Sequence, residues 1–321
     1  MPLEAAISSW PGPAGALGGL VAEAALGYPA ALHRRLPHPV VWIGGAISTL
    51  ERRWNRPGYG AAMRRTLGAA TMILVAGAAG LAGWLLQAGF AGLPFGLVAF
   101  ALAASVGLAQ RSLYDHVAAV RAALDAGDLP AGRKAVGMIV GRDVEQLGAG
   151  QVAAAALESL AESFNDGVVA PAFWLALGGL PGLFVYKAVN TGDSLIGHRE
   201  LRWRAFGWAA ARADDLMNLI PARLAGLMIC LAGTGGLKVM LRDARRHASP
   251  NAGWPEAAMA GALKVRLGGP ARYDGALVER PRFGDGRPPQ ASDLGRGLRL
   301  YLKGCALLWI LMAAGALAWP R

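Results

Sequence analysis

Long apolar stretches alternate with shorter, arginine-rich polar stretches over most of the chain. Two of the apolar stretches, 66–90 and 91–109, follow one another, with Gly92 and Pro94 close to their junction. A transmembrane helix needs about 20 predominantly apolar residues, so this pair predicts a helical hairpin that crosses the membrane twice. Arginines precede the pair and follow it, and the positive-inside rule therefore places both ends of the hairpin in the cytoplasm.

The other apolar stretches are shorter or interrupted. Residues 167–189 contain Pro171, Pro181 and the glycine pair 178–179, which favour a broken or re-entrant segment. Irregular backbone at membrane depth is tolerated only where protein buries it or where it lines a cavity, so this break indicates a binding cavity. Residues 224–240 fit either a span or a re-entrant loop. The candidate membrane segments are 14–32, 66–90, 91–109, 167–189, 224–240 and 304–319.

Polar segments with helical spacing separate these stretches. Residues 38–54 predict a short amphipathic helix at the membrane interface, anchored by Trp42 and Trp54. Residues 110–157 predict polar helical structure, which runs into a single helix over 151–165. The periodicity is helical throughout, so the predicted fold is an all-α, polytopic membrane bundle with broken segments and cytoplasmic polar loops.

Composition supports a membrane protein and narrows its partners. The 321 residues are 54% hydrophobic and only 17% charged, which is too apolar for an ordinary soluble domain. No linker-like segment divides the chain, so a single membrane-embedded domain is expected over 1–321. The net charge of +11 is explained by the positive-inside rule, by a site for anionic substrates such as nucleotide phosphates, or by both. No nucleic-acid-binding module accompanies the charge, which argues against nucleic-acid binding.

Acids, amides and cations recur between apolar runs from Glu158 to Arg223. Glu158 and Glu162 are four residues apart on one predicted helix, so their side chains share a face and repel unless a cation intervenes. Arg223 enters an apolar stretch, where an unpaired cation is costly, which indicates a partner acid or an anionic ligand. Each of these residues could instead form a structural salt bridge within the bundle.

Six motifs in order make the chain resemble adenosylcobinamide-phosphate synthase, the membrane-bound cobalamin-biosynthesis family called CobD or CbiB. The resemblance runs from about Pro37 to Arg299. The motifs are HPVVWIG (38–44), VGRDVEQL (140–147), ESLAESFNDGVVAPAFW (158–174), GGLPGLFVYKAVNTGDSLIGHR (178–199), FGWAAARADDLMNLIPARL (206–224) and DARRHASPNAGWPEAAMAG (243–261).

The resemblance implies an enzyme that joins aminopropanol, or its phosphate, to a carboxylate of the corrinoid cobyric acid. It also implies the use of ATP and a divalent metal such as Mg²⁺, because making an amide in water requires an activated carboxylate. The catalytic acids would be Glu158, Glu162, Asp166 and Asp193. The metal ligands would come from Glu158, Glu162, Asp166, Asp214 and Asp215. Contacts to substrate or nucleotide would come from Lys187, Asn190, Arg199, Arg212, Asn218, Arg223, Asn165 and Asn251.

Two positions depart from the family pattern. Ser163 stands where the family usually has an asparagine directly after the second glutamate, which leaves open which amide contacts the substrate. Tyr28 stands in a Gly-Tyr-Pro sequence where the family commonly has Gly-Asp-Pro, so the early acid is either dispensable or replaced by Glu23.

Two other classes of protein compete with a ligase. A non-catalytic membrane sensor of the same architecture would not need so dense a set of acids and amides. A transporter would fit the broken segments, but the chain lacks repeated halves. The expected location is the inner (plasma) membrane, in several passes, with the active site facing the cytoplasm. There the protein could form a complex with other cobalamin-pathway enzymes.

Overall fold

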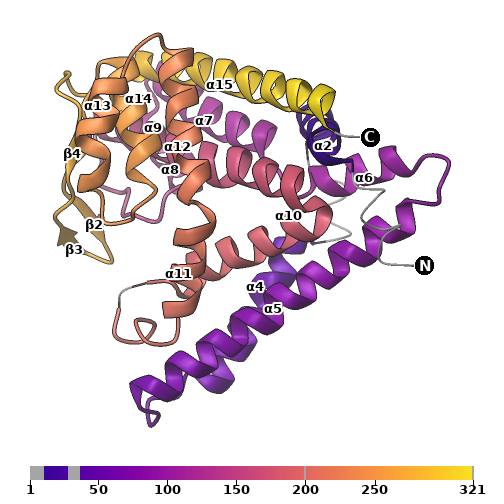
Figure 1. Cartoon of the computed structure of the whole chain (residues 1–321). Coiled ribbons are helices and arrows are strands. Elements are labelled where there is room, and N and C mark those ends of the chain that lie inside the picture. The colour runs from indigo at the N-terminus through magenta and orange to yellow at the C-terminus, as the bar shows by residue number, and fades with distance from the viewer. Residues whose placement is uncertain (1–10, 28–36, 199, 320–321) are drawn as a thin grey trace. The chain divides into compact units, whose positions relative to one another are not determined.

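The computed structural model describes residues 11–27, 37–198 and 200–319, whose regular structure is almost entirely helical (Figure 1). Contacts divide the chain into two compact units that interleave along the sequence. The first unit comprises Met1–Ala109, Ala170–Met217 and Leu311–Arg321, and the second comprises Gln110–Val169 and Asn218–Ile310. A single domain over the whole chain stays a prediction, since these units are judged by contacts alone.

The all-α, polytopic architecture is confirmed. Among the described residues, four helical stretches are long and apolar enough to cross a membrane. A fifth is added if two helices that meet at a 49° bend, Trp208–Met217 and Leu219–Ala232, count as one span. The four stretches are Ala61–Phe90, Gly96–Asp125, Ala149–Ile196 and Ala291–Ala318.

The first unit is built around the long helix α10, which packs against α2, α4, α5 and α11. The predicted interfacial helix is α4, and the His38 side chain caps it by accepting a hydrogen bond from Val40 N (3.3 Å). The helices of this unit are α2 (Gly12–Leu26), α4 (Pro39–Trp54), α5 (Ala61–Phe90), α6 (Gly96–Ser105), α10 (Ala170–Ile196) and α11 (Trp208–Met217).

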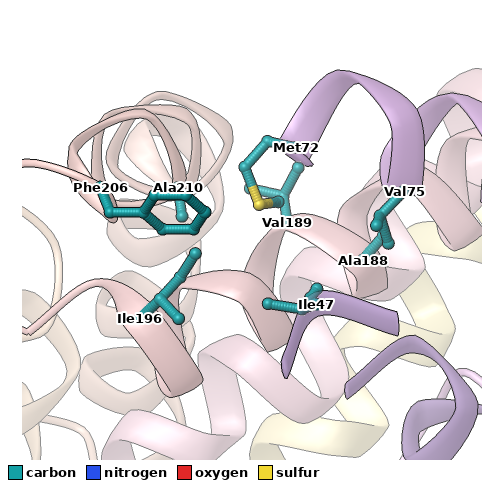
Figure 2. Packing of buried hydrophobic residues seen from close by; sticks show 8 residues of the cluster. All are labelled: Ile47, Met72, Val75, Ala188, Val189, Ile196, Phe206 and Ala210. Atoms are coloured by element: carbon teal, nitrogen blue, oxygen red, sulfur yellow. The ribbon is translucent and has the colours of Figure 1, made fainter. Parts of the chain in front are cut away.

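Apolar side chains of α4, α5, α10 and α11 meet in one core of this unit. Figure 2 shows Met72 and Val75 of α5 near Val189 and Ala188 of α10. Ile47 of α4 belongs to the same cluster. Phe206, which precedes α11, is fully buried in the same cluster and closes it together with Ile196 and Ala210.

The predicted interruption of 167–189 is present as a break within α10. Gly179 has φ 60° and ψ −154°, and Pro181 follows it. The Gln87 side chain of α5 accepts a hydrogen bond from Leu180 N (3.0 Å), so the break is satisfied inside the protein as irregular backbone at membrane depth requires.

The second unit gathers shorter helices around α14, which packs on α9, α12 and α13 (Figure 1). Two small antiparallel pairs, β1 with β4 and β2 with β3, lie in the same unit. Helix α15 (Ala291–Ala318) begins here and ends within the first unit. The other elements are α7 (Gln110–Asp125), α8 (Leu129–Gly137), α9 (Ala149–Phe164), η1 (Asn165–Val169), α12 (Leu219–Ala232), α13 (Leu237–Asp243), η2 (Ala244–Arg246), α14 (Gly253–Leu263), β1 (Leu267–Gly268), β2 (Ala271–Tyr273), β3 (Ala276–Val278) and β4 (Arg282–Phe283).

Some predicted segment boundaries differ from the structure. The stretch 224–240 is divided by a turn after Ala232, where Thr234 and Gly236 adopt left-handed backbone conformations, and α13 follows. The closing apolar stretch 304–319 is the later part of α15, because a polar first half extends the same helix. Helix α2 ends at Leu26, and residues 28–32 of the predicted segment 14–32 lie outside the described residues.

Candidate functional site

The second unit holds a cluster of carboxylates and arginines around α9. This helix begins after Gly148. The N–H of Gly148 donates a hydrogen bond to the Gln151 side chain (2.8 Å), which satisfies one backbone donor at the start of the helix. Glu158 and Glu162 project from one face of α9, as predicted, but in different environments. Glu158 is only 2% exposed, whereas Glu162 is exposed.

Cations on both sides compensate the buried Glu158. Its Oε1 accepts a hydrogen bond from Gly268 N (2.8 Å), and its Oε2 accepts from Arg280 Nη1 (3.2 Å) and from Arg142. Both arginine side chains are themselves mostly buried. These three hydrogen bonds hold the carboxylate in a fixed orientation.

A third carboxylate, Glu256 of α14, lies beside this pair and is 1% exposed. Arg280 Nη2 lies 3.8 Å from its Oε2 and His247 Nε2 lies 3.7 Å from its Oε1. No described residue donates a hydrogen bond to Oε2. Burial, reinforced by the negative charges of Glu162 and Glu158, raises the pKa of Glu256 well above its ordinary value, against the opposing effect of the arginines.

Sequence reasoning missed three members of this cluster: Arg142, Arg280 and Glu256. Two of them lie within the motifs 140–147 and 243–261, so the motifs contained a signal for them. Arg280 lies in a proline- and glycine-rich stretch outside the motifs, and nothing local distinguishes it from neighbouring arginines.

A second polar group forms where α9 ends in the single π-helical turn η1. Asn165 is 3% exposed, and its Nδ2 donates to Asp166 Oδ1 (2.7 Å) and to Asn218 Oδ1 (2.9 Å). The Asn165 Oδ1 atom is buried and accepts no hydrogen bond from a described residue. Turns of this kind are frequent at functional sites because they redirect side chains within a helix. The structure thus brings together three of the predicted residues.

Arg223 and Asn251, also predicted, contact one another in the same unit. Arg223 Nη1 donates to Asn251 Oδ1 (3.1 Å) and to Leu219 O (2.6 Å), and the guanidinium lies 4.6 Å from the centre of the Trp254 ring. None of the ion pairs between described residues includes Arg223. Of the two predicted partners, an acid is therefore not found among the described residues, and an anionic ligand stays a prediction.

The acids of the predicted 190–223 segment come together in the first unit. Asn190 Nδ2 donates to Asp214 Oδ1 (3.2 Å), and Arg212 pairs with Asp215 (3.1 Å). Asp193 lies within electrostatic range of Asp214 and Asp215. Three carboxylates from α10 and α11 thus share one region of this unit.

Two predicted cations remain. Lys187 lines an apolar cavity of about 340 Å³ formed by α4, α5, α6 and α10 within the first unit, together with Trp42 and Phe184. Arg199 lies outside the described residues.

The predicted metal ligands are divided between the two units: Glu158, Glu162 and Asp166 belong to the second, Asp214 and Asp215 to the first. In the part of the chain that the structure describes, no three His, Cys, Asp or Glu side chains are grouped to hold a metal ion. Mg²⁺ is commonly bound by only one or two carboxylates together with substrate phosphates and water. The exposed Glu162 and half-buried Asp166 fit that smaller donor set, whereas Glu158 is occupied by its arginines.

Comparison with known proteins supports the resemblance seen in the motifs. The profile of the family described as CobD/Cbib protein matches residues 16–301. The chain is 51% identical to the cobalamin biosynthesis protein CobD of Rhodobacter capsulatus, over 92% of this chain and 95% of the relative. It is 46% identical to the CobD protein of Brucella anthropi (93% and 95%) and 44% identical to that of Rhizobium meliloti (93% and 95%).

No solved structure matches the chain. The family profile covers most of the chain, and the relatives match it over nearly their whole length. The chain therefore belongs to the CobD/CbiB family.

Proposed function

We propose that the protein is an ATP-dependent amide ligase of cobalamin biosynthesis, which joins aminopropanol or its phosphate to a carboxylate of cobyric acid. Membership of the CobD/CbiB family supports the pathway. One observation supports the chemistry: an exposed acid, Glu162, stands beside two buried acids and two mostly buried arginines in one small region. A membrane sensor of the same architecture would have no need of this costly arrangement.

In this proposal Glu162 is the reacting acid and Glu158 is a positioning residue. An exposed carboxylate can bind the ammonium group of the amine and accept its proton before attack. Glu158 cannot do so while it accepts three hydrogen bonds, and its role is to hold Arg142 and Arg280 in place. Glu256, with its raised pKa, adds little negative charge that would compete for the amine.

ATP would supply the activation of the corrinoid carboxylate, as an acyl phosphate, with Mg²⁺ on its phosphates. Asp166 is the residue that would contact such a metal while Glu162 acts on the amine. Asn165 Oδ1, a buried acceptor that no described residue satisfies, could accept a hydrogen bond from a corrinoid carboxamide that reaches it. We further propose that the site faces the cytoplasm at the inner membrane, where ATP is available, and that neighbouring pathway enzymes could dock there.

The direct test is an assay of the purified protein in detergent with cobyric acid, Mg·ATP and either aminopropanol or its phosphate. Wild-type protein should form the amide, and Glu162→Gln should lower turnover by about 10²–10⁴-fold, as loss of a general base does. Glu279→Gln is the matched control, since Glu279 is an exposed acid of the same unit. It should behave like wild type.

The assay also separates the alternatives. Absence of product with either amine, from protein with a cooperative thermal transition, would contradict the ligase proposal and favour the sensor. Product formation unaffected by Glu162→Gln would leave the ligase but reject Glu162 as its base.

A further inference from the structure

An arginine-lined pocket of about 310 Å³ lies in the second unit, beside the carboxylate cluster. Its walls come from the N-terminal half of α9 and from the segment 266–289. Glu158 and Arg142 line it as well as belonging to the cluster, so pocket and cluster are adjacent. The charged lining residues are Arg142, Arg266, Arg272, Arg282 and Glu158.

Most of the cations of this pocket have no acid partner among the described residues. Arg142 is the one lining arginine paired with Glu158, the only acid in the lining. Arg272 donates to the backbone oxygen of Gly275 (3.1 Å). The side chains of Arg266 and Arg282 form no hydrogen bond or ion pair with any described residue. The pocket therefore carries an excess of positive charge, and the guanidinium groups of Arg266 and Arg282 can donate hydrogen bonds to a ligand.

Several other arginines of the same unit are paired with acids, unlike Arg266 and Arg282. Arg287 Nη1 lies 2.7 Å from Asp293, and Arg296 Nη1 contacts the other oxygen of that acid at 2.7 Å. Arg242 is bound to Asp243 (2.8 Å) in the same way.

The pocket wall is built by a backbone that only glycine adopts easily. Gly268 and Gly269 have φ values of +73° and +93°. A Cβ on Gly268 would lie 2.2 Å from Pro281 O, so the two chain segments meet here at backbone distance. The β1–β4 pairing sets Gly268 opposite Arg282, which fixes that arginine at the rim.

We propose that this pocket binds the phosphate group of a small phosphorylated substrate. Guanidinium groups match phosphate oxygens in planar, paired hydrogen bonds, better than any other side chain does. The volume is at the low end of the about 300–1,000 Å³ found for small-molecule pockets, so it suits a phosphate chain or a phosphorylated amino alcohol rather than a corrinoid. The choice of ligand rests on the proposed function, but binding of phosphate here does not.

The two sources of phosphate are separated by titration calorimetry with the detergent-solubilised protein. ATP, aminopropanol phosphate and unphosphorylated aminopropanol are titrated in turn. Wild type should bind at least one phosphorylated ligand. Arg266→Gln and Arg282→Gln should each raise the Kd for that ligand by about tenfold or more, as loss of a charged hydrogen bond does. The control Arg299→Gln removes an exposed arginine of the same unit outside the pocket and should change nothing.

An unchanged Kd in both pocket variants for both phosphorylated ligands would overturn the proposal. Binding to phosphatidylglycerol vesicles is measured for the same variants. If the substitutions weaken only vesicle binding, the arginines contact the lipid surface and the proposal is overturned. The amide assay is run on the same samples, so the two proposals fail separately. Weakened phosphate binding in a protein that makes no amide keeps the pocket and rejects the ligase. Amide formation with unaltered phosphate binding in the variants rejects the pocket alone.

Discussion

Glu158 and Glu256 lie in one cluster and are both buried, yet the structure predicts opposite responses to the same change. Glu158 accepts hydrogen bonds from Arg142, Arg280 and Gly268 N. Glu256 has a pKa raised by burial and by two neighbouring acids. Replacing each with glutamine keeps the volume and removes the charge.

The magnitudes follow from what each substitution leaves behind. Glu158→Gln leaves two mostly buried arginines with one less counter-charge, and breaking such a pair costs about 3–5 kcal/mol. Glu256→Gln replaces an acid whose burial favours the neutral form with a neutral isostere, and volume-conserving changes in a core cost less than about 1.5 kcal/mol. At about 2–4 °C per kcal/mol, the transition midpoint should fall by roughly 6–20 °C for Glu158→Gln and by a few degrees at most for Glu256→Gln.

The pH dependence provides a second, independent measurement. A carboxyl whose folded pKa lies above its unfolded value of 4.5 binds its proton more tightly when folded. Its contribution to stability is therefore present at acid pH and is lost as pH rises from about 4.5 towards the raised pKa. Glu256→Gln removes this loss, so the stability of the variant relative to wild type should improve with rising pH.

The assay is thermal unfolding in detergent followed by tryptophan fluorescence, at one scan rate and at several pH values from 4 to about 8, because unfolding of such proteins is commonly irreversible. Equal, large drops for both variants at neutral pH would show that Glu256 is ionised in the folded protein. A negligible effect of Glu158→Gln would show that the arginine network does not stabilise the fold. Either result would refute this account of the cluster.

Two further predictions concern the first unit. Gln87→Ala should lower the free energy of unfolding by about 1–3 kcal/mol, because it leaves Leu180 N without an acceptor; thermal unfolding measures this, with Gln87→Glu, which keeps an acceptor oxygen, as the control. Glu51→Gln should lower the free energy of unfolding by about 1 kcal/mol at pH 7, because it weakens the hydrogen bonds from Arg202 and Asn55. Burial raises the pKa of Glu51, but these hydrogen bonds outweigh burial and lower the pKa overall. The contribution of a lowered pKa is lost as pH falls below 4.5, so a difference from wild type that persists undiminished in acid would contradict it.

Local signals in the sequence predicted much of the fold. The apolar stretch 66–90, the amphipathic helix 38–54 and the helix 151–165 each correspond to a helix of the structure, because helical periodicity is a local property. Pro181 and the preceding glycines marked the break in α10, since those residues restrict or free the backbone wherever they stand. The turn after Ala232 was missed although Gly233, Gly235 and Gly236 mark it, because the whole stretch 224–240 was interpreted as one apolar segment.

The partners of the candidate residues could not be predicted in the same way. Arg280 is 122 residues from Glu158 along the chain and reaches it only because the chain folds back after α14. Periodicity identifies which face of a helix a residue occupies but not which distant side chain meets it. The one local signal was Glu256 itself, a single acid in an apolar, alanine-rich helix, where an unpaired charge would be costly.

The pairing of Glu158 changes which acids can act in a reaction. Glu158 and Glu162 are equivalent in sequence, both acids on one face of one helix, and were predicted together as catalysts and metal ligands. Arg142 and Arg280 occupy the first and leave the second exposed. An acid held by two arginines is a poor base and a poor ligand for Mg²⁺, because the same lone pairs are already engaged. In the proposed ligase the acting acid of α9 is therefore Glu162, while Glu158 holds Arg142 at the wall of the proposed phosphate pocket.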